Sequence, residues 1–529
     1  MNDLPDVSRI VAANAALYPH RVAVKDLTRA LTWSQWNDRT SRLANALIGI
    51  GLRRGDRVAV LAFNRVEWME VYAATARAGL VAVPVNFRLA APEVAWIVND
   101  SGARAFIVEG AFTDRIDAAR SELDVPARGF IRLGDANDYP LPGWHDYETL
   151  LAAASHRAPH VHAQPDEPWT LMYTSGTTGR PKGAMRSHAS YAAFYLLNAV
   201  EFSLGRSDVG LLVMPMCHVN SVFYSFVFAW SGGVACIYNR PHFDAGHLLQ
   251  TLVDERITWS SLVPTHCIML LDLPAGVRAT AERAALRKLM VSSAPARRET
   301  KLAIMDQFPR TELFEGYGST EAGLVTLLRP EDQLDHAGSI GREIIGTQPL
   351  RLLDDNGHAV ADGEVGELWS CTPTTFSGYW NQPERSAAAF RDGYCGVGDM
   401  ARRDADGYYE LVDRKHNMII SGGENVYPSE VEAAVAAHPD VRDVAVIGLP
   451  DERWGEAVTA VVVLRDGRPP DEAALLGSLR NRIAGFKRPR RLIFVAAEEM
   501  PRTATGKILH RVLRDRFSTA TPQPSGESA

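Results

Sequence analysis

The sequence has few cysteines, and they follow no metal-binding pattern. Five cysteines occur among 529 residues. None is spaced as Cys-x-x-Cys or accompanied by a nearby histidine pair, which argues against a structural zinc site. We expect buried or inert thiols in a reducing compartment, and a cytoplasmic protein. A chain of this length buries roughly three quarters of its unfolded surface, so it needs no disulfide. The cysteines are Cys217, Cys236, Cys267, Cys371 and Cys395.

The chain also lacks a strong excess of charge of either sign. Lys and Arg total 56 against 63 Asp and Glu, which gives a net charge of −7. This mild acidity argues against a nucleic-acid partner, because proteins held to phosphates by charge are usually basic. A hydrophobic content of 46% with 22% charged residues is typical of globular proteins. The length indicates roughly three domains.

No long apolar run marks the N-terminus, where Asp3, Asp6 and Arg9 argue against a signal peptide. Residues 209–239 contain no Asp, Glu, Lys or Arg and are long enough to span a bilayer. They also contain helix-breaking and polar residues, Pro215 among them. We therefore predict two or three buried elements of an α/β core here, and no integral membrane segment.

Apolar strand-like runs alternate with amphipathic helical stretches as far as about residue 400. Residues 56–63 are a predicted strand, residues 67–79 a helix and residues 80–86 the next strand. This β-α-β order predicts an α/β fold, with mostly parallel sheets flanked by helices. No internal repeat is visible.

The last part of the chain has a different pattern. Ser429 and Glu432 have the spacing of a capping box, and Pro439 would stop the helix that follows. Residues 441–451 and 456–467 are predicted strands, and residues 475–483 a helix. We expect a compact α+β unit, joined to the preceding body within the charged stretch 411–418.

These patterns divide the chain into three parts. They are an N-terminal domain of residues 1–413 that includes a small β subdomain, a C-terminal domain of residues 414–518, and a tail of residues 519–529. The tail is small, polar and Pro-containing, so we expect it to be disordered.

A glycine- and hydroxyl-rich segment follows the apolar run that ends at Tyr173. Glycines let several N–H groups turn toward an anion, hydroxyls add donors, and a lysine adds positive charge. A surface turn does not require this combination, and no Gly-Lys-Ser/Thr follows at Walker spacing. We predict a phosphate-binding loop. Its residues are Thr174, Ser175, Gly176, Thr177, Thr178, Gly179, Lys182 and Gly183.

The run YTSGTTGRPKGA within this loop resembles the signature of the adenylate-forming superfamily. That superfamily includes acyl-CoA synthetases, peptide-synthetase adenylation domains and firefly-type luciferases. Further blocks of the family follow in the expected order, and the resemblance covers residues 10–515. It implies a large α/β domain, a small mobile C-terminal domain and activation of a carboxylic acid by ATP.

The segment LFEGYGSTEAG resembles the family's second nucleotide block. The resemblance implies that Tyr317 stacks on adenine, that Glu315 accepts from the adenine amino group, and that Thr320 contacts the α-phosphate. It also implies that Glu321, with Thr178, holds Mg²⁺. A divalent cation is needed because the attacking carboxylate and the α-phosphate repel one another.

Two further blocks complete the predicted nucleotide site. VSSAPARRE resembles the segment that lines the adenine and acyl pockets, with Ser293 and Ala294 as lining residues beside Gly316. Asp399 and Arg414 occupy the family's ribose-binding positions, and paired hydroxyls suit a carboxylate acceptor.

Lys507, in PRTATGKILHR, resembles the C-terminal catalytic lysine that bridges the carboxylate and the α-phosphate, where positive charge is useful. His218 lies where the family places a residue beside the substrate carboxylate, and a neutral imidazole could orient that oxygen or gate the pocket. Val222 stands where long-chain enzymes often carry a tryptophan gate, which leaves the chain length open. The predicted catalytic residues are Lys507, His218, Glu321 and Thr320.

The family uses its small domain twice, first to present Lys507 and then to build a thiol channel with SGGEN. The implied hinge is His416, where most relatives carry Asp or Lys. The basic residues of GFKRPR are predicted to bind CoA, and the alternative is that they form an exposed charged turn. The predicted CoA-binding residues are Arg88, Gly422, Gly423, Trp454, Phe486, Arg488 and Arg490.

The function implied is an ATP- and Mg²⁺-dependent carboxylic acid–CoA ligase that forms acyl-CoA, AMP and pyrophosphate through an acyl-adenylate. The predicted pocket has no Arg or Lys for a second carboxylate, so a medium- or long-chain fatty acid is the first expectation and an aryl or alicyclic acid the second. The alternatives are a stand-alone enzyme that loads a carrier protein, a luciferase-like oxygenase and a non-enzymatic nucleotide-binding protein. A homodimer is also possible for this chain. The pocket residues are His218, Val219, Asn220, Ser293, Ala294, Gly316 and Ala322.

Overall fold

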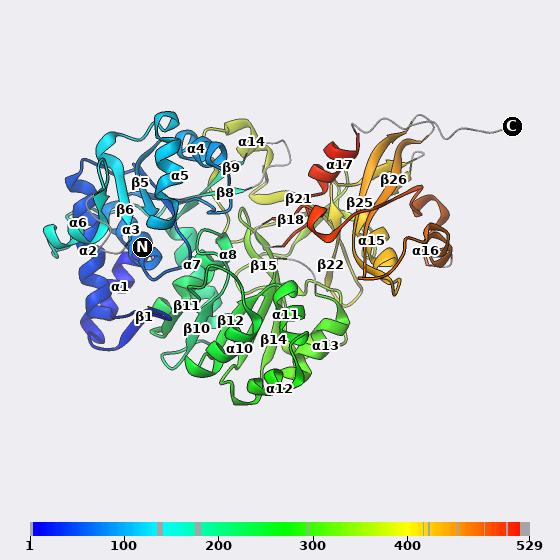
Figure 1. Cartoon of the computed structure of the whole chain (residues 1–529), viewed down its shortest axis with the longest axis horizontal. Coiled ribbons are helices and arrows are strands. Elements are labelled where there is room, and N and C mark those ends of the chain that lie inside the picture. Colours follow the sequence, from blue (N-terminus) through cyan, green and yellow to red (C-terminus); the bar gives the residue numbers. More distant parts are fainter. Residues whose placement is uncertain are drawn as a thin grey trace. The chain divides into compact units, whose positions relative to one another are not determined.

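The computed structural model describes residues 4–134, 141–174, 181–293, 296–415, 417–421, 424–451, 454–480, 482–503 and 506–518. Contacts between residues divide the chain into two compact units (Figure 1). Unit 1 comprises Met1–Leu350 and Ser370–Val397, and unit 2 comprises Arg351–Trp369 and Gly398–Ala529. The domain boundary expected after residue 413 falls inside unit 2 and stays a prediction.

Unit 1 contains an eight-stranded sheet in the order β19-β9-β8-β4-β3-β5-β6-β7. The expected β-α-β unit is confirmed, because β3 and β4 are parallel and are connected by α3 (Glu67–Ala78), which is buried along its whole length. Gly79 ends α3 in the left-handed region at φ 63°, which glycine adopts readily. The strands are β3 (Arg57–Leu61), β4 (Val81–Pro84), β5 (Ala103–Glu109), β6 (Phe130–Leu133), β7 (His145–Asp146), β8 (Pro168–Thr174), β9 (Lys182–Ser187) and β19 (Gly378–Tyr379).

The second sheet of unit 1 has nine strands in the order β16-β15-β14-β13-β12-β10-β11-β1-β2. Its central strands run parallel from β1 to β14, and the edge strands β2, β15 and β16 are antiparallel. The strands are β1 (Val22–Asp26), β2 (Ala30–Thr32), β10 (Val209–Leu212), β11 (Val234–Ile237), β12 (Trp259–Leu262), β13 (Lys288–Ser292), β14 (Glu312–Ser319), β15 (Gly323–Leu328) and β16 (Arg342–Glu343).

Helices cover both sheets. A large aromatic-rich core, with Trp33, Trp36, Trp68, Trp169 and Trp259 fully buried, joins inward faces of both sheets through α2, α3, α7, α8 and α9. Helices α4 and α5 cover the other face of one sheet, and α10, α11 and α13 cover the other face of the second (Figure 1). The helices are α1 (Val7–Leu17), α2 (Trp33–Gly49), α3 (Glu67–Ala78), α4 (Ala91–Asp100), α5 (Thr113–Ala118), α6 (Tyr147–Ala153), α7 (His188–Glu201), α8 (Val219–Ser225), α9 (Val227–Ser231), α10 (Ala245–Asp254), α11 (Pro264–Leu271), α12 (Ala275–Arg278), α13 (Arg298–Gln307) and α14 (Pro383–Ala388).

The uncharged stretch 209–239 folds as the sequence predicts, into buried elements of this core. It forms β10, α8, α9 and β11, and β10 pairs with β11 in parallel. Within the described part of the chain, no helix is both long enough and apolar enough to cross a membrane. The cysteines are free thiols, and burial raises the pKa of Cys217, Cys236, Cys267 and Cys395 to about 12.

Two smaller sheets complete the chain. One has the order β17-β18-β21-β20 with β22 paired to β21, and the unit boundaries fall within β18 and β21. The other, in unit 2, has the order β24-β23-β26-β25 with β27 paired to β26. The elements are β17 (Arg351–Leu353), β18 (Gly366–Ser370), β20 (Phe390–Arg391), β21 (Tyr394–Arg403), β22 (Tyr409–Arg414), β23 (Ile419–Ser421), β24 (Glu424–Val426), β25 (Val441–Asp451), β26 (Gly455–Leu464), β27 (Arg491–Phe494), α15 (Pro428–Ala436), α16 (Glu472–Ser478) and α17 (His510–Ser518).

The predicted capping box of α15 is wrong, although the helix itself forms. Ser429 lies inside the first turn, and its N–H donates to Asp413 Oδ2 at 3.0 Å. Glu432 instead accepts from Val446 N–H at 2.8 Å and contacts His510. A tertiary partner therefore replaces the local one. Helix α16 also begins earlier than predicted, at Glu472, because Asp471 caps its N-terminus, and it ends at Ser478.

Candidate active site

The predicted phosphate loop is closed at its base by a hairpin. β8 ends at Thr174 and β9 begins at Lys182, and these two residues are cross-strand partners. The Tyr173 hydroxyl donates to Asp100 Oδ2 at 2.6 Å, and Gly183 lies against the Tyr173 ring, where a Cβ would come within 3.1 Å. The structure therefore fixes both ends of the loop. The predicted loop residues that lie outside the described residues are Ser175, Gly176, Thr177, Thr178 and Gly179.

Lys182 and Glu321 both contact Tyr379, a residue that the sequence patterns did not single out. Strand β19 pairs with β9, so that Tyr379 lies beside the phosphate loop. The Lys182 ammonium is 4.7 Å from the centroid of the Tyr379 ring. The Tyr379 hydroxyl donates to Glu321 Oε1 at 2.9 Å. The structure thus joins the predicted phosphate-binding lysine to the predicted metal-binding carboxylate.

Thr320 and Glu321 lie in the turn between β14 and β15. The turn requires Gly323 at φ 82°, in the left-handed region. Thr320 C=O accepts from Arg186 Nη1 at 2.7 Å, and Glu321 C=O accepts from Phe376 N–H at 2.7 Å. Both carbonyls are held by segments distant in the chain, which fixes the backbone that carries the two functional side chains.

The predicted adenine residues lie along β14. Tyr317 is buried and Gly316 has no room for a side chain, since a Cβ would lie 2.0 Å from Met290 Cε. Glu315 Oε1 accepts from Ala296 N–H at 3.0 Å, and Glu315 Oε2 forms a buried ion pair with Lys301. Burial raises the pKa of Glu315, and the charge of Lys301 opposes that rise.

Ser293 directly follows β13 and has φ 72°, a left-handed conformation that is unusual for a residue with a side chain. Strained backbone of this kind concentrates at functional sites. The position also agrees with the general rule that ligands bind beyond the carboxyl ends of parallel strands. Ala294 lies outside the described residues.

His218 is the N-terminal cap of α8. Its Nδ1 accepts from Asn220 N–H at 3.3 Å, and burial lowers the pKa of His218 to about 4, so the ring is neutral near pH 7. Asn220 Nδ2 donates to Ser261 Oγ at 3.3 Å and to Ser292 Oγ at 2.9 Å. Because Ser261 and Ser292 lie at the carboxyl ends of β12 and β13, this contact places α8 at the carboxyl edge of the sheet, next to Ser293. Val222 is fully buried.

In unit 2 the structure brings together three of the predicted residues. Asp399 and Arg414 are cross-strand partners of β21 and β22, and Arg414 Nε lies 2.8 Å from Asp399 Oδ1. Desolvation and then the charge of Arg414 lower the pKa of Lys507, while Asp399 and Asp413 oppose this change. The Lys507 N–H donates to Thr503 Oγ1 at 3.1 Å. Asp399 and Arg414 therefore lie close enough to Lys507 for their charges to act on its pKa.

The predicted CoA residues are divided between the units. In unit 2, the Arg490 guanidinium carbon lies 3.7 Å from the Trp454 ring centroid, Phe486 is 36% exposed and Arg488 follows it. Gly422 and Gly423 lie outside the described residues, as does His416.

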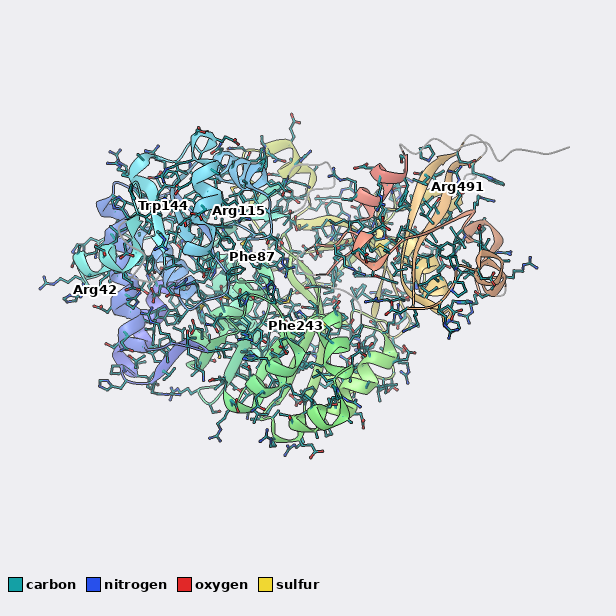
Figure 2. All side chains as sticks on the ribbon, viewed as in Figure 1. Arg42, Phe87, Arg115, Trp144, Phe243 and Arg491 are labelled. Carbon is teal, nitrogen blue, oxygen red and sulfur yellow. The ribbon has the colours of Figure 1, made fainter. Side chains whose placement is uncertain are left out.

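Arg88 belongs to unit 1. It is exposed, and its guanidinium lies 5.5 Å from the ring centroid of Phe87. Arg115 Nη1 donates to Phe87 C=O at 3.2 Å and to Leu89 C=O at 3.0 Å, which holds the turn that carries Arg88 (Figure 2).

The family of the protein follows from comparison with known proteins. The model of the AMP-binding enzymes matches residues 11–380, and that of the AMP-binding enzyme C-terminal domain matches residues 430–507. The chain therefore belongs to the AMP-binding, adenylate-forming enzyme family, and it has that family's fold. It is an enzyme, an AMP-forming acid–thiol ligase of the acyl-CoA synthetase type.

Its relatives differ in the acids that they are named for. Feruloyl-CoA synthase of Amycolatopsis sp is 38% identical, over 95% of this chain and 97% of its own. Indoleacetate–CoA ligase of Aromatoleum aromaticum is 36% identical, over 95% of this chain and 96% of its own. The solved structure of a Mycobacterium tuberculosis fatty acyl CoA synthetase is 33% identical with a TM-score of 0.77, and the match covers 98% of this chain and 99% of that one.

Proposed function

We propose that the protein is an ATP-dependent carboxylic acid–CoA ligase that works through an acyl-adenylate. The observation that carries this proposal is the Lys182–Tyr379–Glu321 arrangement, which joins the base of the phosphate loop to the turn of Thr320. This turn follows β14, whose neighbour β13 ends beside Asn220 and therefore close to His218. Groups suited to a triphosphate and to a carboxylate thus lie at the carboxyl edge of the nine-stranded sheet, to which the eight-stranded sheet adds Lys182 and Tyr379.

The donor set fits Mg²⁺. Mg²⁺ in nucleotide-dependent enzymes is usually held by one or two carboxylates together with substrate phosphates. Glu321 supplies one oxygen-donor side chain, oriented by Tyr379, and Thr178 would add a hydroxyl. When bound, the ion would neutralise charge on the phosphates.

In the first half-reaction, a carboxylate oxygen of the acid attacks the α-phosphorus of ATP, a P–O bond forms and pyrophosphate leaves. Lys182 would hold the departing phosphates, and Thr320 would donate to the α-phosphate. The neutral ring of His218 would orient the carboxylate without drawing it into an ion pair. Lys507 would place positive charge where the two anions meet.

In the second half-reaction, the thiol of CoA attacks the acyl carbon and AMP leaves. We propose that the C-terminal domain of residues 414–518 turns about His416 between the two steps and presents Gly422 and Gly423 to the pantetheine arm. Arg88, Arg488 and Arg490 would bind the phosphates of CoA, with Trp454 and Phe486 beside it.

The acid is proposed to be apolar, with a medium- or long-chain fatty acid first. Asn220 donates from its amide nitrogen to Ser261 and Ser292, so that nitrogen is not free to donate to a polar group of the substrate. Among the predicted pocket residues that the structure describes, none carries a positive charge to bind a second carboxylate. An aryl acid is the second candidate, because the feruloyl and indoleacetate enzymes match almost the whole chain.

The test is a pyrophosphate-release assay with ATP, Mg²⁺ and a panel of octanoate, palmitate, ferulate, indoleacetate and cyclohexanecarboxylate, each with and without CoA. We expect turnover to require CoA, with acyl-CoA found by mass spectrometry, and fatty acids to give the highest kcat/KM. Preference for ferulate or indoleacetate would select the aryl candidate. Stoichiometric adenylate without CoA-dependent turnover would instead indicate transfer to a carrier protein.

A further inference from the structure

Arg186, in β9, is a fully buried arginine directly behind the Thr320–Glu321 turn. Its exposed fraction is 0%, and burial lowers its pKa. Nη1 donates to Thr320 C=O at 2.7 Å, and Nη2 donates to Thr374 C=O. One guanidinium group therefore holds the backbone of two segments that are far apart in the sequence.

Aromatic rings, rather than a carboxylate, cover the charge of Arg186. The guanidinium carbon lies 4.7 Å from the ring centroid of Phe223 and 5.1 Å from that of Tyr191. Within the described part of the chain, no carboxylate is in ion-pair contact with it, although the charge of Glu321 acts on it, and its Nε lacks a hydrogen-bond partner. A buried arginine is costly unless its donors are used, so a structural purpose for this one is expected.

The Thr374 carbonyl, the second acceptor of Arg186, indicates the structural purpose of the buried arginine. Thr374 Oγ1 donates to Ala322 C=O at 3.1 Å, and the neighbouring Phe376 N–H donates to Glu321 C=O at 2.7 Å. Arg186 thus fastens the turn directly at Thr320 and indirectly through the Thr374–Phe376 segment. Phe223 also belongs to α8, the helix that His218 caps, so the same arginine contacts the elements of both proposed subsites.

We propose that Arg186 is a positioning residue that sets the direction of Glu321 and Thr320 and thereby makes ATP binding responsive to Mg²⁺. This inference rests on the proposed function, in which Glu321 holds the ion. The planar fork of arginine donates to two carbonyls at once, which a lysine ammonium on a flexible stem does not reproduce. The conservative variant Arg186→Lys should therefore lose the effect although it keeps the charge.

Arg77 is a matched control within unit 1. It is also buried and donates to backbone carbonyls, to Asn37 C=O at 2.9 Å and to Ser8 C=O at 3.0 Å, and burial lowers its pKa to about 10. It lies among α1, α2 and α3, on elements that do not include the Thr320–Glu321 turn. Loss of Arg77 should cost stability without altering the response to Mg²⁺.

The experiment measures ATP affinity by calorimetry without acid or CoA, across a Mg²⁺ titration and in EDTA, for wild type, Arg186→Lys, Arg186→Met and Arg77→Lys. For both Arg186 variants we expect the Mg²⁺ concentration at half-maximal ATP affinity to rise about tenfold, the size of one lost charge-assisted hydrogen bond. Their affinity in EDTA should change by a smaller factor than their affinity in Mg²⁺, because the phosphate loop is untouched and only the contact of Thr320 is affected. Arg77→Lys should match wild type.

Circular dichroism identifies the folded variants, and Arg186→Lys alone decides the outcome if Arg186→Met does not fold. A wild-type Mg²⁺ response in folded Arg186→Lys would overturn the inference, as would an equal shift in Arg77→Lys. If wild-type protein binds ATP without any effect of Mg²⁺, the proposed role of Glu321 is refuted and this inference falls with it. If wild-type protein responds to Mg²⁺ and only the expected shift in Arg186→Lys is missing, this inference is wrong but the proposed function still stands.

Discussion

Single side chains at the proposed site take their properties from neighbours that are distant in the chain. Glu321 is oriented by Tyr379, and Glu315 is paired with Lys301. His218 is neutral because it is buried, and its pKa of about 4 means that it does not titrate at neutral pH. The activity should therefore show no ionisation of His218 between about pH 6 and about pH 8.

Lys507 carries the clearest prediction at this scale. Lys507→Ala should lower the rate of acyl-adenylate formation by about a thousandfold or more, because a positioned charge at the reacting anions is lost. Thioester formation from supplied acyl-adenylate should be nearly unchanged. Single-turnover assays of each half-reaction measure both effects.

Lys288→Ala is the control, since Lys288 pairs with Glu312 at 3.5 Å at the opposite end of β14 from the Thr320 turn. Both of its half-reactions should match wild type. Equal losses of both half-reactions in Lys507→Ala would contradict the use of the small domain in two separate steps.

At the scale of elements, α17 is fastened to α15 and β25 by one acid–base pair. His510 Nε2 lies 2.6 Å from Glu432 Oε1, which also accepts from Val446 N–H. Burial disfavours the charged ring, but the hydrogen bond and charge of Glu432 outweigh burial and raise the pKa of His510. The helix that follows Lys507 is thus held by a contact that depends on pH.

The direction in which pH changes the stability contributed by the His510–Glu432 pair can be tested. A raised pKa in the folded state contributes stability that is fully present below the unfolded pKa and is lost as pH rises through the folded pKa. His510→Gln should therefore destabilise the protein by roughly 1 kcal/mol or more in mildly acidic buffer, and less in alkaline buffer. Calorimetric melting across this pH range measures the difference.

His358→Gln is the matched control, because His358 is largely exposed, with its side chain 81% accessible and 3.7 Å from Asp354. Its melting temperature should follow wild type at each pH. A constant difference between His510→Gln and wild type at all pH values would refute the proposed pair.

At the scale of the whole molecule, the chain forms two compact units, and the expected hinge position follows strands held within unit 2. Lys415 lies 3.2 Å from Glu367, and Asn417 Nδ2 donates to Asp413 Oδ1 at 3.3 Å. His416, between them, lies outside the described residues. Both contacts lie within unit 2, and the Asn417–Asp413 hydrogen bond would have to break if the chain turned at residue 416.

His416→Pro tests this position. Proline fixes φ near about −65°, so the domain should be trapped in one arrangement, with one half-reaction retained and the other lowered by about a hundredfold or more. Pre-steady-state assays of both half-reactions give the result, and His416→Ala should retain both. Full activity of His416→Pro in both steps would eliminate His416 as the hinge.

The sequence alone determined the features whose cause is local. The period of apolar residues predicted β3, α3 and β4, and the glycine, hydroxyl and lysine cluster of 174–183 predicted a phosphate loop whose base the hairpin now defines. The order of motifs identified the family. The predictions of these three elements and of the family succeeded because strand alternation, turn residues and motif spacing are properties of neighbouring residues, whereas phosphate binding by the loop stays a prediction.

The tertiary structure alone decided which distant groups meet. Tyr379 joins Lys182 to Glu321 because β19 pairs with β9, and Arg186 reaches Thr320 and Thr374 because one guanidinium spans two segments. The same cause made the local capping box of Ser429 and Glu432 wrong, since His510 and Val446 bind Glu432 instead. Long-range strand pairing and buried hydrogen bonds leave no periodic trace in the sequence, because each partner is specified only when the chain is folded.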